Sequence, residues 1–248
     1  MSKRRDIDHV LKAWKYEPGD VAARVVRAGD GREVLQMRID LGVLQLELDG
    51  RPDGMRPGGA ETYFDYLLAV ALHEGDDFVL TEDQCAEADR EFVQFYHRRM
   101  CWLAMREFRR AVRDADHSLG FMDFVRSCSP SEEWTSSHEQ YRPFIIFHRT
   151  QALALAELED GGPEPAVEAV ADGLERLKRC YIEAGIDEST LEEDELVVRL
   201  HELRESVREH YHLGQTLAEQ LADAVAAEEF ERAAQLRDEI ARRSSSRA

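Results

Sequence analysis

The sequence has no apolar run of the ~18 residues that a membrane-spanning helix requires. Its first residues, MSKRRDIDHVLKAW, contain basic side chains, but no apolar stretch of signal-peptide length follows them. Hydrophobic residues make up 43% of the chain and charged residues 33%, which is too apolar for a disordered chain and too charged for a membrane protein. We therefore expect a globular cytoplasmic protein that makes no membrane contact.

Positive charge is also scarce in this chain. There are 51 acidic residues against 32 lysines and arginines, so the formal net charge is -19. A field of this sign repels the phosphate backbone of nucleic acids unless a local basic patch overcomes it. We expect no direct binding to duplex nucleic acid.

The common signatures of catalytic and metal sites are absent from the sequence. It contains no HExxH, no GxSxG and no GxxxxGK[ST] pattern. Asp114 and His117 lie three residues apart, a spacing at which we expect ordinary ion pairing or capping. Four cysteines occur singly, without a CxxC pair, and we expect them to be reduced and partly buried: Cys85, Cys101, Cys128 and Cys180. The sequence therefore predicts no metal and no cofactor, and it favours a non-enzymatic protein over an enzyme.

The first sixty residues have the pattern of a small antiparallel sheet. Two β-prone runs, Val21–Ala28 and Glu33–Asp40, flank the turn-forming GDG at 29–31. A third run follows at Val43–Gly50, where leucines alternate with polar residues. That period of two is typical of a strand with one solvated face. We predict a three-stranded meander.

The loop DGRPDGMRPGG, Asp49–Gly59, ends the strand-rich segment, because its Gly and Pro residues prevent a regular element from continuing. Asp49, Arg51 and Asp53 cluster here and form a candidate ligand loop. A pocket at this loop, beside the helices that follow, would suit an enzyme or a ligand-binding protein. Turn formation by the Asp-Gly pairs explains the same residues without any ligand.

The pattern after this loop is helical. Thr81 followed by Glu82 is a typical helix start, and the SPS sequence at 129–131 indicates a break. The stretch between these points is too long for one ordinary globular helix. We expect two helices joined by a turn near Met105 to Glu107.

A second pair of helices is predicted around Gly161 and Gly162, which end one helix before Pro163 begins the next. These hairpins resemble tetratricopeptide-type repeats, with REFRRAV at 106–112 and PEPAVEAV at 163–170 at the start of each second helix. The spacing of the two stretches is far above the 34-residue period of that family. We therefore predict stacked helical hairpins and infer no peptide binding from them.

From Asp187 onward the sequence predicts a long amphipathic helix. Its apolar stripe alternates spacings of three and four and implies a partner helix. The stripe consists of Leu196, Leu200, Leu203, Val207, His210, Gly214, Leu217, Leu221 and Ala224. Because Gly214 is unfavourable in a helix, either the helix bends there or a new helix begins near Thr216.

The segment EEFERAAQLRDEI, Glu228–Ile240, supplies a second helix whose small residues allow close packing. Together with TLAEQLADAVAA, 216–227, it resembles the UVR motif. That motif is a helical hairpin shared by the B and C subunits of the bacterial excision-repair nuclease and by some protein-arginine kinase activators. The residues that carry the resemblance are Leu217, Leu221, Glu229, Phe230, Glu231, Ala233, Ala234, Leu236, Arg237, Asp238 and Ile240.

The resemblance implies an interaction element that docks against another helical hairpin and performs no chemistry. The partner hairpin would lie in a second copy of the chain or in another protein that carries the motif. As a whole, the chain is similar to small bacterial proteins with a C-terminal UVR hairpin. The implied interaction residues are Phe230, Glu231, Ala233, Ala234, Leu236, Arg237, Asp238 and Ile240.

We expect two of these residues, Phe230 and Arg237, to have different roles. Arg237 has no acid three or four positions away on its own helix, so we expect its charge partner to lie elsewhere, in a docked molecule, unless its stem extends over the alanines into solvent. We expect Phe230 to be mainly structural, buried against the seam of the preceding helix, and Arg237 to be mainly interfacial.

Taken together, these patterns predict an α+β fold that is mainly α. The expected segments are a strand-rich part at 1–59, a body of helical hairpins at 60–186, and a C-terminal part at 187–248 that contains the motif at 214–243. The function that the sequence favours is non-catalytic protein–protein interaction through the C-terminal hairpin. The alternative is an enzyme or ligand-binding protein with a pocket at the Asp49–Gly59 loop.

Overall fold

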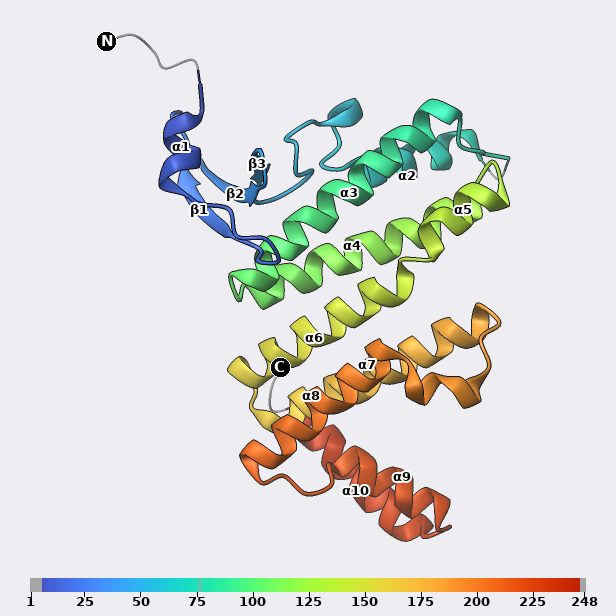
Figure 1. Cartoon of the computed structure of the whole chain (residues 1–248). Coiled ribbons are helices and arrows are strands. Elements are labelled where there is room, and N and C mark those ends of the chain that lie inside the picture. Colours follow the sequence, from blue (N-terminus) through green and yellow to red (C-terminus); the bar gives the residue numbers. More distant parts are fainter. Residues whose placement is uncertain (1–5, 76, 246–248) are drawn as a thin grey trace. The chain divides into compact units, whose positions relative to one another are not determined.

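The computed structural model of the chain describes residues 6–75 and 77–245. In this part of the chain ten α-helices accompany one three-stranded antiparallel sheet, which confirms the predicted mainly α, α+β fold (Figure 1). The contacts divide the chain into two compact units, with the boundary between Ala152 and Leu153. The three segments expected from the sequence remain a prediction. None of the described helices is long and apolar enough to span a bilayer.

The sheet lies near the start of the first unit, after a short helix α1 (Asp8–Ala13). Its strands β1 (Ala23–Arg27), β2 (Glu33–Ile39) and β3 (Gly42–Glu47) pair in sequence order. Leu35 of β2 pairs with Leu46 of β3, and both side chains are buried. On the neighbouring register Gln36 pairs with Gln45, and their side-chain amides are hydrogen-bonded at 3.2 Å. The alternation that predicted one apolar and one polar face is therefore present.

The helices of the first unit follow a short 3-10 helix, η1 (Pro57–Gly59). They are α2 (Tyr63–Glu74), α3 (Glu82–Ala104), α4 (Phe108–Ser127) and α5 (Glu132–Glu139), followed by α6 (Arg142–Asp160), which crosses the boundary between the two units. Thr81 and Gln84 form a capping box at the start of α3, because each side chain accepts a hydrogen bond from the backbone of the other. Helix α3 packs along α4, and the turn between them lies at 105–107, as the sequence predicts (Figure 1).

A buried ion pair joins α3 to α4. Arg98 and Asp114 are 2% and 0% exposed, and Nε and Nη2 of the arginine donate to the two carboxylate oxygens at 2.8 Å each. The remaining terminal nitrogen of Arg98 donates to the backbone carbonyls of Glu47 and Gly50 at 3.2 and 2.8 Å. One guanidinium therefore connects both helices to the end of the sheet, with its charge balanced.

A second buried carboxylate, that of Glu91 on α3, holds the start of α2. It accepts hydrogen bonds from the backbone N–H groups of Tyr63 and Phe64 at 2.7 and 3.0 Å. The same carboxylate lies 3.2 Å from Nε of Arg51 and 3.1 Å from Nε2 of His117. A negative charge at a helix N-terminus is favourable, since the first N–H groups have no partner within the helix.

The second unit contains α7 (Pro163–Glu183), a 3-10 helix η2 (Glu188–Glu193) and α8 (Glu195–Tyr211), followed by α9 and α10. Helix α7 packs against α8 through a core that includes Ala166, Val167 and Val207. Helix α8 ends at Tyr211, and its C-cap residue His212 has a left-handed φ of 52°. The predicted seam is therefore interrupted before Gly214, and a new helix begins after Thr216, the second of the two arrangements expected from the sequence.

The side chains of Cys85, Cys101 and Cys128 have free thiols. Cys85, Cys101 and Cys128 are buried, and Cys180 is half-buried. Burial raises the pKa of the Cys101 thiol to about 12, so this side chain is a neutral core residue at physiological pH.

Candidate functional site

The last two helices form a hairpin that corresponds to the predicted interaction element. Helix α9 spans Leu217–Ala226 and α10 spans Phe230–Ser245. The hydroxyl oxygen of Thr216 accepts from the backbone N–H of Glu219 at 3.2 Å, and the Glu219 carboxylate accepts from the backbone N–H of Thr216 at 2.9 Å. This reciprocal capping box fixes the start of α9.

Alanine and leucine side chains form the interior of the hairpin. Ala224 of α9 is 2% exposed, and Ala233 and Leu236 of α10 are each 8% exposed. Leu217 and Leu221 are partly buried against them. Alanine at the contact lets two helices approach closely, so the two helices pack together over a narrow apolar core.

Phe230 does not belong to this interior. The sequence predicts that Phe230 is mainly structural and buried against the preceding helix, but its side chain is 69% exposed. The difference arises because Phe230 is the first residue of α10, directly after the turn at 227–229, where the interior of the hairpin has not yet begun. A large aromatic side chain is thus presented at one end of the hairpin.

Arg237 also differs from its expected environment. Because no acid lies three or four positions from Arg237 on its own helix, the sequence predicts a charge partner elsewhere. In the structure Nε and Nη2 of Arg237 donate to the carboxylate of the adjacent residue, Asp238, at 3.2 and 3.0 Å. A long arginine side chain can reach its sequence neighbour by curling along the surface, a contact that helical spacing alone does not reveal. Both side chains are largely exposed.

Phe230, Ala234 and Arg237 recur at spacings of four and three, so they share one side of α10, on which Phe230 and Arg237 are exposed and Ala234 is half-buried. Glu231 and Asp238 are exposed beside them, whereas Ile240 is half-buried. The eight predicted interaction residues therefore divide between the two sides of α10. Ala233 and Leu236 hold the hairpin together, and the others lie at or near its surface.

Val225, which the sequence analysis did not single out, is a further exposed apolar residue of the hairpin. Its side chain is 53% exposed on α9, close to the turn. It lies directly after Ala224, the last residue of the predicted seam, and therefore outside the buried stripe. An apolar residue just off a well-defined seam is the signal that would have identified it.

Polar contacts connect the hairpin to the helix before it. Arg208 of α8 forms an ion pair with Glu219, the residue that also caps α9. Burial raises the pKa of the Glu219 carboxyl, but the hydrogen bond from the Thr216 backbone and the ion pair with Arg208 outweigh it, so the pKa lies below its usual value. Leu213, in the connection, packs against Val167 and Val207.

The second predicted site, the Asp49–Gly59 loop, lines a cavity of about 400 Å³ in the first unit. Asp49, Arg51 and Asp53 all border it. Arg51 is 3% exposed, and its guanidinium already pairs with Glu87 at 2.5 Å and with Glu91 at 3.2 Å. Its charge is thus balanced by α3. Within residues 6–75 and 77–245 there is no group of three His, Cys, Asp or Glu side chains that could hold a metal ion.

Comparison with known proteins identifies the hairpin. Residues 215–243 match the family model of the UvrB/uvrC motif, which confirms the resemblance inferred from the sequence. The matched residues comprise the cap of α9, all of α9, the turn and α10 as far as residue 243. No curated protein and no solved structure matches the chain. The tetratricopeptide-like character of the preceding helices remains a prediction.

Proposed function

We propose that this protein is a non-catalytic interaction protein whose C-terminal hairpin docks against the same hairpin of a second copy. The observation that carries the proposal is the 69% exposure of Phe230 within a segment that matches a known helical-hairpin motif. Burying an exposed phenylalanine contributes roughly 1.5–3 kcal/mol. In a two-fold symmetric dimer each copy buries the same residue, so this stabilisation arises once for each copy.

The charges of α10 support a second copy as the occupant. The start of the helix is net acidic, with Glu229 and Glu231 against Arg232, and its end is net basic, with arginines at 237, 242 and 243 against Asp238 and Glu239. If two copies of α10 pair antiparallel, the acidic start of each faces the basic end of the other. The surface is then complementary to itself, as a two-fold interface requires. The same distribution also suits the helix dipole.

A partner protein with a similar hairpin is the alternative occupant. It would use the same exposed face, because the interior of the hairpin is already filled by Ala224, Ala233 and Leu236. The proposed role is therefore assembly, either of this chain with itself or of this chain with a second hairpin-bearing protein. If this protein is monomeric at every concentration but binds such a partner through Phe230, the occupant is the partner protein and not a second copy.

Replacing Phe230 by alanine is expected to weaken self-association by ~10-fold or more while leaving the monomer's stability within about 0.5 kcal/mol of the original. The reason is that this side chain has few contacts within its own chain. Sedimentation velocity over a concentration series measures the association, and urea unfolding of the dilute protein measures the stability.

Leu236→Ala is the matched control, since it removes a side chain of similar character from the interior of the same helix. It is expected to destabilise the hairpin by roughly 2–5 kcal/mol. Arg237→Glu should weaken association with little change in unfolding, because its pair with Asp238 is exposed. If Phe230→Ala and Leu236→Ala both destabilise the monomer, and neither changes its association, the docking role is wrong.

A further inference from the structure

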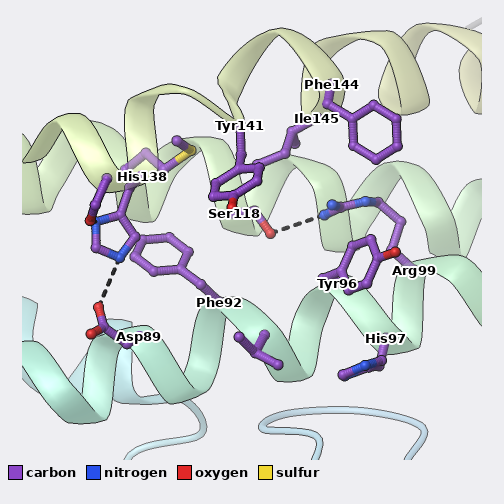
Figure 2. Close-up of a pocket in the computed structure, with 13 residues that line it drawn as sticks. Asp89, Phe92, Tyr96, His97, Arg99, Ser118, His138, Tyr141, Phe144 and Ile145 are labelled. Carbon is purple, nitrogen blue, oxygen red and sulfur yellow. Dashed lines mark hydrogen bonds and ion pairs between the residues drawn. The ribbon is translucent and has the colours of Figure 1, made fainter.

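The first unit contains a second cavity, of about 620 Å³, that is distinct from the one at the Asp49–Gly59 loop. It is bordered by α3, α4, α5 and the start of α6 (Figure 2). Its walls are largely apolar and include Phe92, Val93, Met122, Phe144 and Ile145. Cavities of this size and character are typical of small-molecule sites, in which a few polar groups orient an otherwise apolar ligand.

The polar group that distinguishes this cavity is the guanidinium of Arg99. This residue of α3 borders the cavity and is 2% exposed. Its Nη1 donates to the hydroxyl of Ser118 at 3.2 Å, and among the described residues its Nε has no hydrogen-bond partner. In the chain as described, the hydrogen-bonded partner of this buried cation is a neutral hydroxyl.

The adjacent residue, Arg98, is a buried arginine whose hydrogen bonds and charge are satisfied within the chain. Arg98 is equally buried, and it holds both oxygens of Asp114 as well as two backbone carbonyls. Asp114 is also the carboxylate that acts on Arg99, but its oxygens are already bound by Arg98. A buried charge without a balancing partner is strongly unfavourable, so a negatively charged ligand that balances Arg99 would account for its burial.

Arg99 nevertheless remains a cation at neutral pH. Burial lowers its pKa to about 10, which is still well above 7. The neighbouring histidines add no second positive charge there. Burial, followed by the charge of Arg99, lowers the pKa of His148 to about 3, and burial lowers the pKa of His97, which borders the cavity. The cavity therefore presents one positive charge at this end.

The opposite end of the cavity is occupied by a partnered carboxylate. Figure 2 shows Arg99 directed toward Ser118 at one end and the Asp89–His138 pair at the other. The carboxylate of Asp89 lies 2.8 Å from Nε2 of His138 and accepts from Nε1 of Trp134 at 3.1 Å. A ligand anion is attracted to the Arg99 end and repelled by Asp89, so the charge distribution fixes a single orientation.

We propose that this cavity binds a small organic monoanion, with its carboxylate on Arg99 and Ser118 and its apolar body against Phe92, Val93 and Ile145. A carboxylate matches the planar fork of a guanidinium and supplies one negative charge for one positive charge. A phosphate monoester would bring a second negative charge into a site with a single cation. The apolar body is either an alkyl chain or an aromatic ring system, and the experiment separates these two sources.

The test measures binding of decanoate and of 1-naphthylacetate to the full-length protein by isothermal titration calorimetry. Decanol and 2-(1-naphthyl)ethanol serve as neutral counterparts of the two acids. We expect saturable binding of at least one acid and weaker binding of the corresponding alcohol. Binding of decanoate alone identifies an alkyl body, and binding of 1-naphthylacetate alone identifies an aromatic body. If neither acid binds at concentrations up to about 1 mM, the proposal is wrong.

Arg99→Met tests the role of the cation. It is expected to weaken binding of the acid roughly 10- to 100-fold, because hydrogen bonds to a charged group are lost, and to leave binding of the alcohol unchanged. Arg90→Met is the matched control, since Arg90 lies on the same helix, is exposed, and is not among the residues bordering the cavity. Equal affinity of the acid for the original protein and for Arg99→Met would overturn the assignment.

Thermal unfolding without ligand separates a binding role from a structural one. If Arg99 serves a ligand, Arg99→Met should melt at the same temperature as the original protein or higher, since an unbalanced buried charge has been removed. A marked drop in melting temperature would show that Arg99 is structural.

Val93→Trp is the second variant. Val93 is 54% exposed at the border of the cavity, so the larger ring is expected to fill space there and block both acid and alcohol without unfolding the protein.

Discussion

Asp114→Ala is expected to lower the free energy of unfolding by about 3–5 kcal/mol, because it leaves the guanidinium of Arg98 buried without its counter-charge. Arg98 is 2% exposed, so water cannot replace the two hydrogen bonds that it donates to Asp114 at 2.8 Å. Chemical unfolding in urea, followed by circular dichroism of the helices, measures the loss. The effect should be large because the same guanidinium connects α3, α4 and the end of the sheet.

Two controls make this prediction specific. Asp116→Ala removes an exposed carboxylate of the same helix that pairs with Arg149, and it should change stability by less than about 1 kcal/mol. The double variant Arg98→Met with Asp114→Leu removes both charges and should recover much of the loss, because a buried pair can often be replaced by apolar side chains of similar volume. Equal losses for Asp114→Ala and Asp116→Ala would contradict the structural account of the pair.

The ends of many elements could be predicted from the sequence because they depend on local chemistry. Thr81 caps α3 with its neighbour Gln84, Gly162 precedes α7, and the break at 129–131 separates α4 from α5. The partners of the buried charges could not be predicted in the same way. The three-residue spacing of Asp114 and His117 predicts local ion pairing or capping, but Asp114 pairs with Arg98 on another helix, and His117 contacts Glu91. Such contacts depend on how helices pack, which local spacing does not determine.

The candidate sites show the same limit. The UVR resemblance identified the hairpin because its residues are contiguous, but periodicity shows only which residues share a face. It does not show which face the chain itself covers, so the exposure of Phe230 emerged only from the structure. Nothing in the local sequence FYHRRMCW distinguishes Arg98 from Arg99. Their different positions around α3 direct Arg98 toward the carboxylate of Asp114 and Arg99 toward the apolar cavity.

Glu91→Ala is expected to lower the free energy of unfolding by a similar amount, about 3–5 kcal/mol. Glu91 is 0% exposed, and its removal leaves two backbone N–H groups at the start of α2, those of Tyr63 and Phe64, without their acceptor. It also removes one of the carboxylates that balance Arg51. Since α2 begins at these residues, amide hydrogen exchange in α2 should increase more than exchange in α4, and urea unfolding measures the total loss.

Glu87→Ala is the matched control for this prediction. Glu87 lies one turn earlier on α3 and pairs with the same arginine at 2.5 Å, but its side chain is 27% exposed and no backbone N–H of α2 is among its recorded partners. Glu87→Ala should lower the free energy of unfolding by only about 1 kcal/mol, because Arg51 still pairs with Glu91 and water can reach the position that Glu87 occupied. If the two variants lose equal stability and show the same exchange in α2, then the capping of α2 by Glu91 contributes nothing, and the pair with Arg51 alone explains why this carboxylate is buried.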